Sequence, residues 1–158
     1  MSDVLLWPIA VPFVGAILCF LFPRRTAEPV GILAGGLTAA SVLPVVVRIV
    51  EGNVLRLEVG GWGAPLGIDL VADGLSTLML LMTATVGLIV SLYARRYFGD
   101  ASHGAEPRAR ELFWPIWLIL WGSLNALFVS ADIFNLYVVL ELVGLGAVGL
   151  VVLTGTRA

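Results

Sequence analysis

Five long runs of apolar residues constrain what this 158-residue chain can fold into. Each run is long enough for a helix across a bilayer's hydrocarbon core, which needs about 20 residues. Hydrophobic residues make up 59% of the chain and charged residues 13%, too few to cover a water-soluble domain. The sequence therefore predicts an all-α polytopic membrane protein with one membrane domain over residues 1–158. The predicted transmembrane helices cover residues 4–22, 29–50, 71–93, 112–129 and 133–153.

Arginines supply all nine basic residues and indicate the orientation of these helices. Seven of them follow the first, third or fifth apolar run, whereas Arg48 and Arg56 lie at the other ends of the helices. Basic residues concentrate on the cytoplasmic side of membrane proteins. The N-terminus is therefore predicted outside and the C-terminus in the cytoplasm.

The segment between the second and third runs predicts a short extracytoplasmic β-hairpin. In residues 54–59 the apolar side chains alternate with Arg56 and Glu58, as in a strand with one covered face. Two glycines follow, and PLGIDL supplies a second extended run. The polar segment FGDASHGAEPRARE, between the third and fourth runs, is predicted to be a cytoplasmic loop.

The sequence contains no pattern typical of soluble-enzyme chemistry. One cysteine and one histidine are present, and no group of Cys, His and carboxylates has metal-ligand spacing. No glycine-rich loop follows a strand to bind phosphate. We expect no cofactor, no metal and no nucleic-acid partner, and do not expect this chain to act as an enzyme alone.

A carboxylate, Glu141, interrupts the fifth apolar run near its middle. With Asp132 as helix cap, Glu141 lies nine residues along, or about 13 Å at 1.5 Å per residue. Placing a carboxylate that deep costs roughly 2.5 kcal/mol or more, so the group should face protein or water and have a partner. Glu141 is the main candidate for a proton-carrying group. The alternative is a protonated side chain that serves only packing.

Four further polar residues are candidates for support of this site. Tyr137 lies one turn before Glu141 on the same face, within reach of a hydrogen bond. Asp132 and Asp73 stand at helix starts, where an N-cap is favoured over the entrance of an ion path. Asn125 in the fourth helix is more typical of a hydrogen bond between helices than of a ligand.

Other residues in the apolar runs are predicted to serve packing. The same interhelical hydrogen bonding is expected of Ser76, Thr83 and Thr85 in the third helix. Gly31 and Gly35 form a GxxxG pattern, which indicates close helix contact. Three tryptophans on one face of the fourth helix are interpreted as membrane-interface anchors and packing residues: Trp114, Trp117 and Trp121.

Two segments resemble a known family of membrane subunits. DIFNLYVVLELVGL (residues 132–145) and GGWGAPLGIDLVADGLSTLMLL (residues 60–81) are similar to antiporter-like subunits shared by Mrp-type cation/proton antiporters, complex I and membrane-bound hydrogenases. The second segment contains the Asp-x-Leu-Ser pattern of that family, here Asp73, Leu75 and Ser76. The sequence of residues 132–137 favours the D-type subunit of Mrp antiporters.

The resemblance implies a proton-translocating helix bundle in a bacterial or archaeal plasma membrane. In that family a Glu in the fifth helix pairs with a Lys in the seventh, and Glu141 is the position that carries over. Members have many more helices than five, and this chain has no lysine.

Two interpretations follow from this difference. In the first, the chain belongs to a heteromeric complex in which a second chain supplies the lysine-bearing helices and completes a proton path coupled to Na⁺ or another cation. In the alternative, it is a non-transporting structural or assembly subunit of a respiratory or hydrogenase-type complex. An unpartnered buried carboxylate is costly, which favours the first interpretation.

Overall fold

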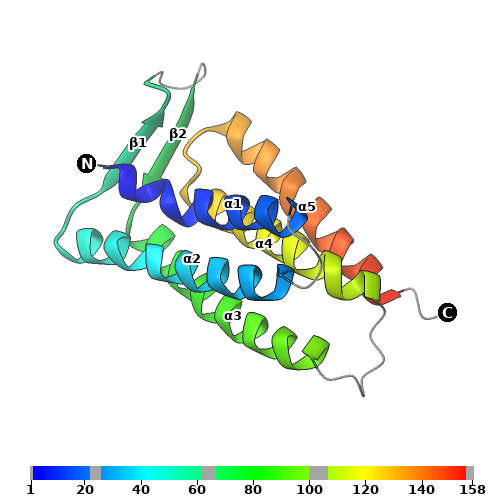
Figure 1. Ribbon diagram of the computed structural model, residues 1–158. Coiled ribbons are helices and arrows are strands. Elements are labelled where there is room, and N and C mark those ends of the chain that lie inside the picture. Colours follow the sequence, from blue (N-terminus) through cyan, green and yellow to red (C-terminus); the bar gives the residue numbers. More distant parts are fainter. Residues whose placement is uncertain (1, 22–25, 62–66, 100–106, 156–158) are drawn as a thin grey trace.

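The computed structural model describes residues 2–21, 26–61, 67–99 and 107–155 (Figure 1). Within them, five helices are long and apolar enough to cross a membrane, as the sequence predicts. Helix α1 begins beside the hairpin, and α5 ends at the opposite end of the bundle (Figure 1). The helices are α1 (Trp7–Leu21), α2 (Ala27–Val50), α3 (Gly74–Gly99), α4 (Pro107–Val129) and α5 (Ile133–Gly155), and a 3-10 turn, η1 (Ser2–Leu5), precedes α1.

Two of the predicted helices have different bounds in the structure. The third helix was predicted from residue 71, but residues 71 and 72 belong to a strand, and the helix continues beyond residue 93 to Gly99. Helix α4 begins at Pro107, so the end of the predicted polar loop is helical. Proline suits the first position of a helix because the amide hydrogen it lacks would have no partner there. Residues 100–106 of the predicted loop lie outside the described residues.

The predicted hairpin is confirmed. Strands β1 (Leu55–Val59) and β2 (Ile68–Ala72) pair antiparallel, with Leu55 opposite Ala72 and Val59 opposite Ile68. Leu55 and Ala72 are buried in the same core cluster as residues of η1 and of the α2, α3 and α4 helices. The hairpin therefore lies against one end of the bundle and covers it.

Helix α4 occupies the centre of the bundle and packs against α1, α3 and α5. Its side chains Trp114, Leu118 and Trp121 are almost completely buried, with at most 1% of each exposed. Trp117 is half-buried, and its ring N–H donates to the Ser91 hydroxyl at 3.0 Å. The predicted packing role of these tryptophans is confirmed. The interface-anchor interpretation is wrong for Trp114 and Trp121, because both rings lie between helices.

Glycines on neighbouring helices make room for these rings. A methyl group at Gly31 of α2 would collide with the Trp114 ring, and one at Gly87 of α3 would collide with Trp121. At Gly35 the corresponding methyl would lie 3.2 Å from Trp121. The GxxxG pattern of α2 does mark close helix contact, but its glycines accept indole rings instead of another backbone.

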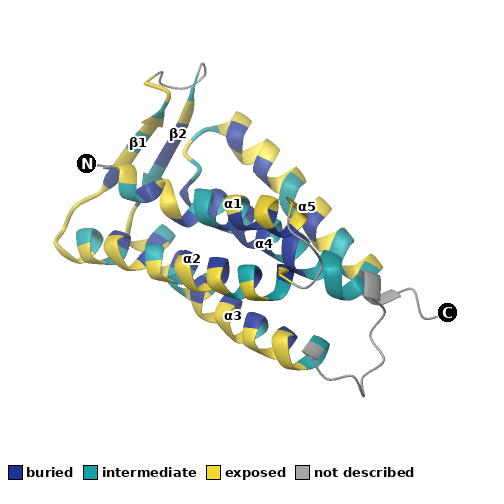
Figure 2. Cartoon of the chain, in the orientation of Figure 1, coloured by how far each residue is buried: buried dark blue, intermediate teal, exposed yellow. Residues whose placement is uncertain are grey.

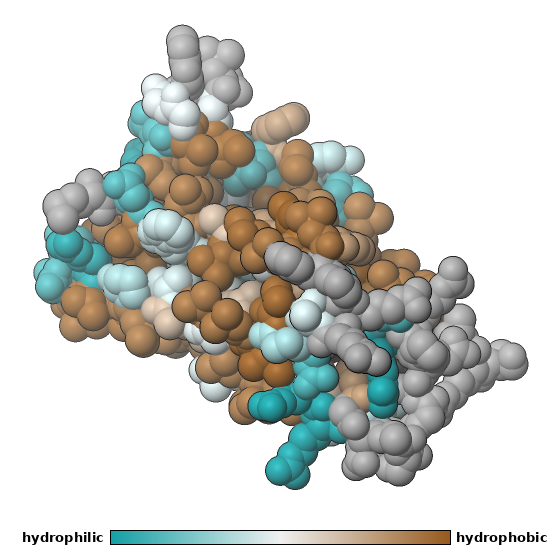
Figure 3. Space-filling view, viewed as in Figure 1, coloured by the Kyte–Doolittle hydropathy of each residue, from teal (hydrophilic) through white to brown (hydrophobic). Residues whose placement is uncertain are grey.

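Helix α5 lies at the edge of the bundle and packs chiefly against α4. Only 11% of its membrane span is buried, against 50% for α4. Most of its surface in Figure 2 is exposed. On the side of the whole molecule that Figure 3 shows, hydrophobic residues cover the middle, and hydrophilic residues gather toward the ends of the helices.

The glycine–tryptophan packing predicts a position-dependent effect of a single methyl group. Gly31→Ala or Gly87→Ala should destabilise the bundle by about 1–3 kcal/mol, because the new methyl overpacks a filled core. Gly36→Ala is a matched control, since nothing lies within 4 Å of its added methyl. Thermal unfolding of the purified chain in detergent measures the difference, and equal melting temperatures for the three variants would contradict this packing.

Candidate functional site

Glu141 lies on the face of α5 that does not contact α4. The contact face includes Val139, which is buried, and Gly146, where an added methyl would lie 3.1 Å from Leu120 of α4. Glu141 is exposed. Its carboxylate therefore points away from the five-helix bundle, not into it.

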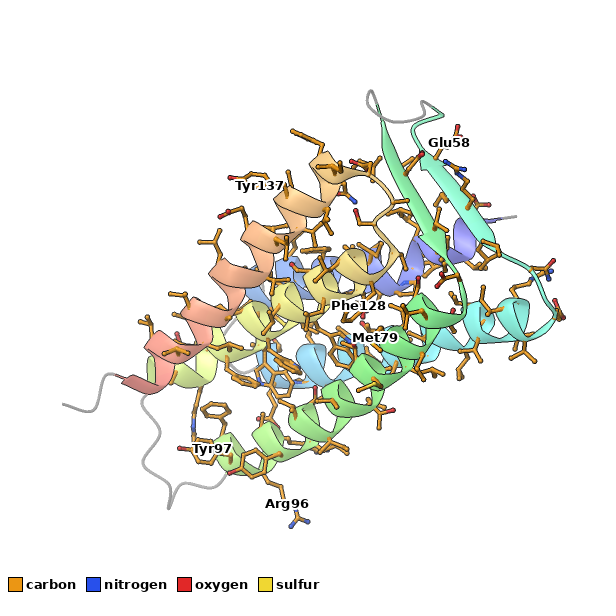
Figure 4. All side chains as sticks on the ribbon, turned by 180° about the vertical axis from the view of Figure 1, so that it is seen from behind. Glu58, Met79, Arg96, Tyr97, Phe128 and Tyr137 are labelled. Atoms are coloured by element: carbon orange, nitrogen blue, oxygen red, sulfur yellow. The ribbon has the colours of Figure 1, made fainter. Side chains whose placement is uncertain are left out.

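Apolar side chains surround Glu141 on this face of α5. Leu145 is 69% exposed and Val148 is 62% exposed, and both follow Glu141 at helical spacing. Tyr137, one turn before Glu141, is 64% exposed and projects outward from α5 (Figure 4). A methyl group built at Gly144 would meet nothing within 4 Å. This face of α5 is thus open, and its described side chains are apolar except for Tyr137 and Glu141.

Glu141 makes no hydrogen bond or ion pair with the residues that the structure describes. The hydrogen bond predicted from Tyr137 is therefore not present in this part of the chain. A carboxylate at this depth of a membrane helix requires protein or water around it.

Asp132 is the N-cap of α5, as predicted. One carboxylate oxygen accepts the backbone N–H of Asn135 at 2.7 Å. The other accepts the backbone N–H of Asp69 in β2 at 3.2 Å. The same carboxylate therefore caps the helix that carries Glu141 and ties that helix to the hairpin.

Asp69 is a residue that sequence reasoning missed. Its carboxylate forms an ion pair with Arg56 of β1 at 3.1 Å, and only 8% of its side chain is exposed. Its carbonyl accepts the N–H of Ala131 at 2.9 Å. The signal was available, because in an antiparallel pair Arg56 of β1 and a residue of β2 can meet diagonally across one face. Only the register, with Glu58 opposite Asp69, identifies which residue that is.

Asp73 is the N-cap of α3, which confirms the second predicted cap. Its carboxylate accepts the backbone N–H of Ser76 at 2.8 Å and the Ser76 hydroxyl at 2.9 Å. These bonds, the backbone one first, lower the pKa of Asp73 below its ordinary value of 3.8. Because the folded-state pKa is the lower one, this stabilisation is present above pH 3.8 and is lost as the pH falls through the folded-state pKa.

Asn125 bonds between helices, as predicted, and the structure shows why it is needed. Pro12 in α1 has no amide hydrogen, so the carbonyl of Pro8 lacks its usual donor four residues on. The side-chain amide of Asn125 donates to that carbonyl at 2.7 Å. Asn125 is fully buried, and its own carbonyl oxygen has no partner among the described residues. The Asn125 side chain thus supplies the hydrogen bond to the Pro8 carbonyl that Pro12 cannot make.

The predicted interhelical bonds of the third helix are wrong. Thr83 donates to the Met79 carbonyl at 2.7 Å, and Thr85 donates to the Leu81 carbonyl at 2.8 Å. Both bonds stay within one helix, where the carbonyl four residues back is the nearest acceptor for a threonine hydroxyl. Ser76 bonds to its own helix cap instead.

The predicted site residues do not form one cluster. Asp132 and Asp73 lie at the hairpin end, Asn125 lies between α4 and α1, and only Tyr137 and Glu141 share the open face. Beside α4, a groove of about 210 Å³ separates it from α3, and the side chains of Met79 and Phe128 lie there (Figure 4). This groove is lined almost entirely by apolar atoms. Among the described residues, the candidate functional site is therefore the face of α5 that carries Tyr137 and Glu141.

These features define a class of protein, a multi-pass membrane protein with a capped, carboxylate-bearing helix at its edge. No protein-family model matches the chain. It is 32% identical over 166 aligned residues to the D subunit of the Na⁺/H⁺ antiporter of Bacillus subtilis, covering 99% of this chain and 31% of that protein. It is 33% identical over 132 residues to the N subunit of NADH-quinone oxidoreductase from Desulforudis audaxviator, covering 84% of this chain and 25% of that protein.

A solved structure shares the fold. The chain superposes on a chain of the Mrp complex from Dietzia with a TM-score of 0.74 and 25% identity, covering 94% of this chain and 26% of that chain. The protein is thus homologous to the antiporter-like membrane subunits represented by the D-type subunit of Mrp antiporters and the N subunit of NADH-quinone oxidoreductase. It spans about a third of the length of the Bacillus subtilis relative.

The Asn125–Pro8 bond predicts a thermodynamic coupling across the α1–α4 interface. Asn125→Leu should destabilise the chain by about 1–3 kcal/mol, because it leaves a buried carbonyl unpaired. Pro12→Ala restores an amide hydrogen to that carbonyl, so the same Asn125 substitution should have a smaller effect in the Pro12→Ala background. Unfolding free energies of the four chains in detergent measure this coupling. Strictly additive effects would show that the two groups do not share the carbonyl.

Because Asp132 both caps α5 and bonds to β2, two different substitutions at this position should destabilise the protein to different extents. Asp132→Ala should destabilise α5 by about 0.5–2 kcal/mol, since it removes the cap and the tie to β2. Asp132→Asn retains one acceptor oxygen and should retain the cap but not the tie. Hydrogen exchange resolves the two effects, with the amide of Asn135 unprotected only in the alanine variant and the amide of Asp69 unprotected in both. Unchanged protection of Asp69 would contradict the tie.

Proposed function

We propose that this chain contributes Glu141 to a proton path in a multisubunit cation/proton antiporter, with Na⁺ as the leading candidate for the exchanged cation. The observation that carries the proposal is the position of Glu141 in a membrane span, exposed on the one face of α5 that the bundle leaves uncovered. In lipid that position is unfavourable for a carboxylate. Covered by further helices, it becomes a buried group able to bind and release a proton.

The same position identifies the kind of partner required. A buried carboxylate is stabilised by a basic group with good geometry. The 158 residues include no lysine, and each of the nine arginines stands at or near the end of an apolar run. The basic partner therefore comes from polypeptide outside these residues, in helices that pack on the α5 face. Gly144, with open space beside it, lets such a helix approach close to Glu141.

The relatives support a role in a heteromeric membrane complex. One is named as the D subunit of a Na⁺/H⁺ antiporter, another as the N subunit of an NADH-quinone oxidoreductase, and the related structure is that of the Mrp complex. In such an assembly this chain is a multi-pass subunit of a plasma membrane. Because five of its helices are long and apolar enough to cross a membrane, we assign it to the membrane transport part of the complex.

The mechanism alternates two states of one carboxyl group. In the first, the Glu141 carboxylate pairs with the partner's lysine ammonium. In the second, Glu141 has taken up a proton and become neutral, and the lysine is released to interact with the next charged group along the path. Loss of the proton restores the pair. Tyr137, one turn away on the same face, is placed to orient the carboxylate or a water between them.

The test measures cation-driven proton movement in inverted membrane vesicles that contain the whole complex. Glu141→Gln keeps the size and hydrogen-bonding capacity of the side chain but cannot take up a proton. It should abolish collapse of a preformed pH gradient on addition of Na⁺, while Tyr137→Phe should slow that collapse without abolishing it. The collapse rate is followed with a pH-sensitive dye.

The control separates proton transfer from assembly. Glu58→Gln removes an exposed carboxylate on β1, outside the membrane spans, and should leave flux at the wild-type rate. Native gels confirm that each variant complex assembles. Undiminished flux in an assembled Glu141→Gln complex would assign the chain a structural role instead.

A further inference from the structure

A second open surface lies on the other side of the bundle, between α2 and α3. It is a groove of about 490 Å³, a volume typical of small-molecule sites. Small side chains line its floor on both helices, and a methyl built at Gly36 would meet nothing within 4 Å. The lining residues on α2 are Gly36, Ala39, Ala40 and Leu43, and those on α3 are Leu81, Ala84, Thr85, Leu88 and Ile89.

The groove is suited to an alkyl chain. Its one hydroxyl, that of Thr85, already donates to the Leu81 carbonyl at 2.8 Å. The helix backbones satisfy their own hydrogen bonds, so the walls offer no unpaired donor to a polar ligand. An unbranched hydrocarbon chain can lie in such an apolar groove without desolvating any polar group.

An exposed arginine, Arg96, lies beyond one end of the groove on α3. On α3 the exposed residues Thr85, Ile89, Leu92 and Arg96 follow one another at helical spacing and form a stripe. Arg96 lies seven residues beyond Ile89, about 10 Å farther along the helix. Its side chain extends away from the end of α3 (Figure 4). It forms no ion pair with the described residues.

The neighbouring arginine neutralises the acidic group at this end. Arg95 pairs with Glu28, in the first turn of α2, at 3.6 Å. The Glu28 carboxylate is therefore compensated by Arg95, whereas Arg96 forms no ion pair among the described residues. An arginine at the end of a membrane helix reaches the level of lipid headgroups.

We propose that this groove binds one anionic phospholipid. An acyl chain lies between α2 and α3 along the small residues, and the headgroup phosphate contacts the Arg96 guanidinium. The apolar floor of the groove suits the acyl chain, and Arg96, which has no ion pair among the described residues, suits the negative charge of the headgroup. The site lies on α2 and α3, apart from the α5 face, and does not depend on the proton path.

The test is native mass spectrometry of the assembled complex released from micelles. The micelles contain either phosphatidylglycerol or phosphatidylcholine with the same acyl chains. The wild-type complex should retain one more phosphatidylglycerol than the Gly36→Leu complex, whose added side chain fills the groove. Arg96→Gln should weaken retention of phosphatidylglycerol about fivefold, the effect of one basic residue near a charged membrane surface, and leave phosphatidylcholine unchanged.

Two control variants locate the effect. Arg48→Gln removes an arginine at the opposite end of α2, and Ala10→Leu enlarges a side chain in the separate groove between α1 and α2. Both should behave as wild-type. Equal retention of the two lipids by wild-type would overturn the headgroup contact. Unchanged retention by Gly36→Leu, or a cysteine crosslink from this groove to a helix of another subunit, would overturn the site.

Discussion

The packing of α4 tryptophans onto glycines of α2 and α3 is the contact on which the bundle depends. In a membrane the lipid is as apolar as the helix surface, so close packing must supply the stability that hydrophobic exclusion supplies in water. Trp114 and Trp121 bring two large flat surfaces to the centre, and Gly31 and Gly87 remove the side chains that would keep these rings out. This contact positions α4 at the centre, and α4 in turn is the helix on which α5 rests.

The centre and the edge of the molecule are therefore built for different purposes. Around α4, polar side chains form hydrogen bonds within the bundle. Asn125 replaces a backbone donor that Pro12 lacks, and Ser91 accepts the ring N–H of Trp117. At the edge, α5 is mostly uncovered and carries a carboxylate without a partner among the described residues. In the proposed function, further helices pack on this face of α5 and cover Glu141.

Sequence reasoning predicted the five spans, the hairpin and both aspartate caps, because length, alternation and capping act within a few residues. It also singled out Glu141 as a candidate, since one charge in an apolar run is visible without a structure, and that role stays a prediction. It misassigned the threonine hydrogen bonds and the interface role of two tryptophans, which depend on the direction a helix face takes. It missed Asp69, because the pairing with Arg56 depends on the strand register and the bond to Asp132 joins residues 63 apart in the chain.

The tie between the hairpin and α5 restricts how this protein can change in length. Successive residues of a strand face opposite sides, so inserting a single residue into β1 or β2 would turn Asp69 away from Arg56 or move its amide away from Asp132. Insertions of two residues preserve the alternation but shift the level at which α5 begins. The lengths of the two strands are therefore constrained by the helix to which they are bonded.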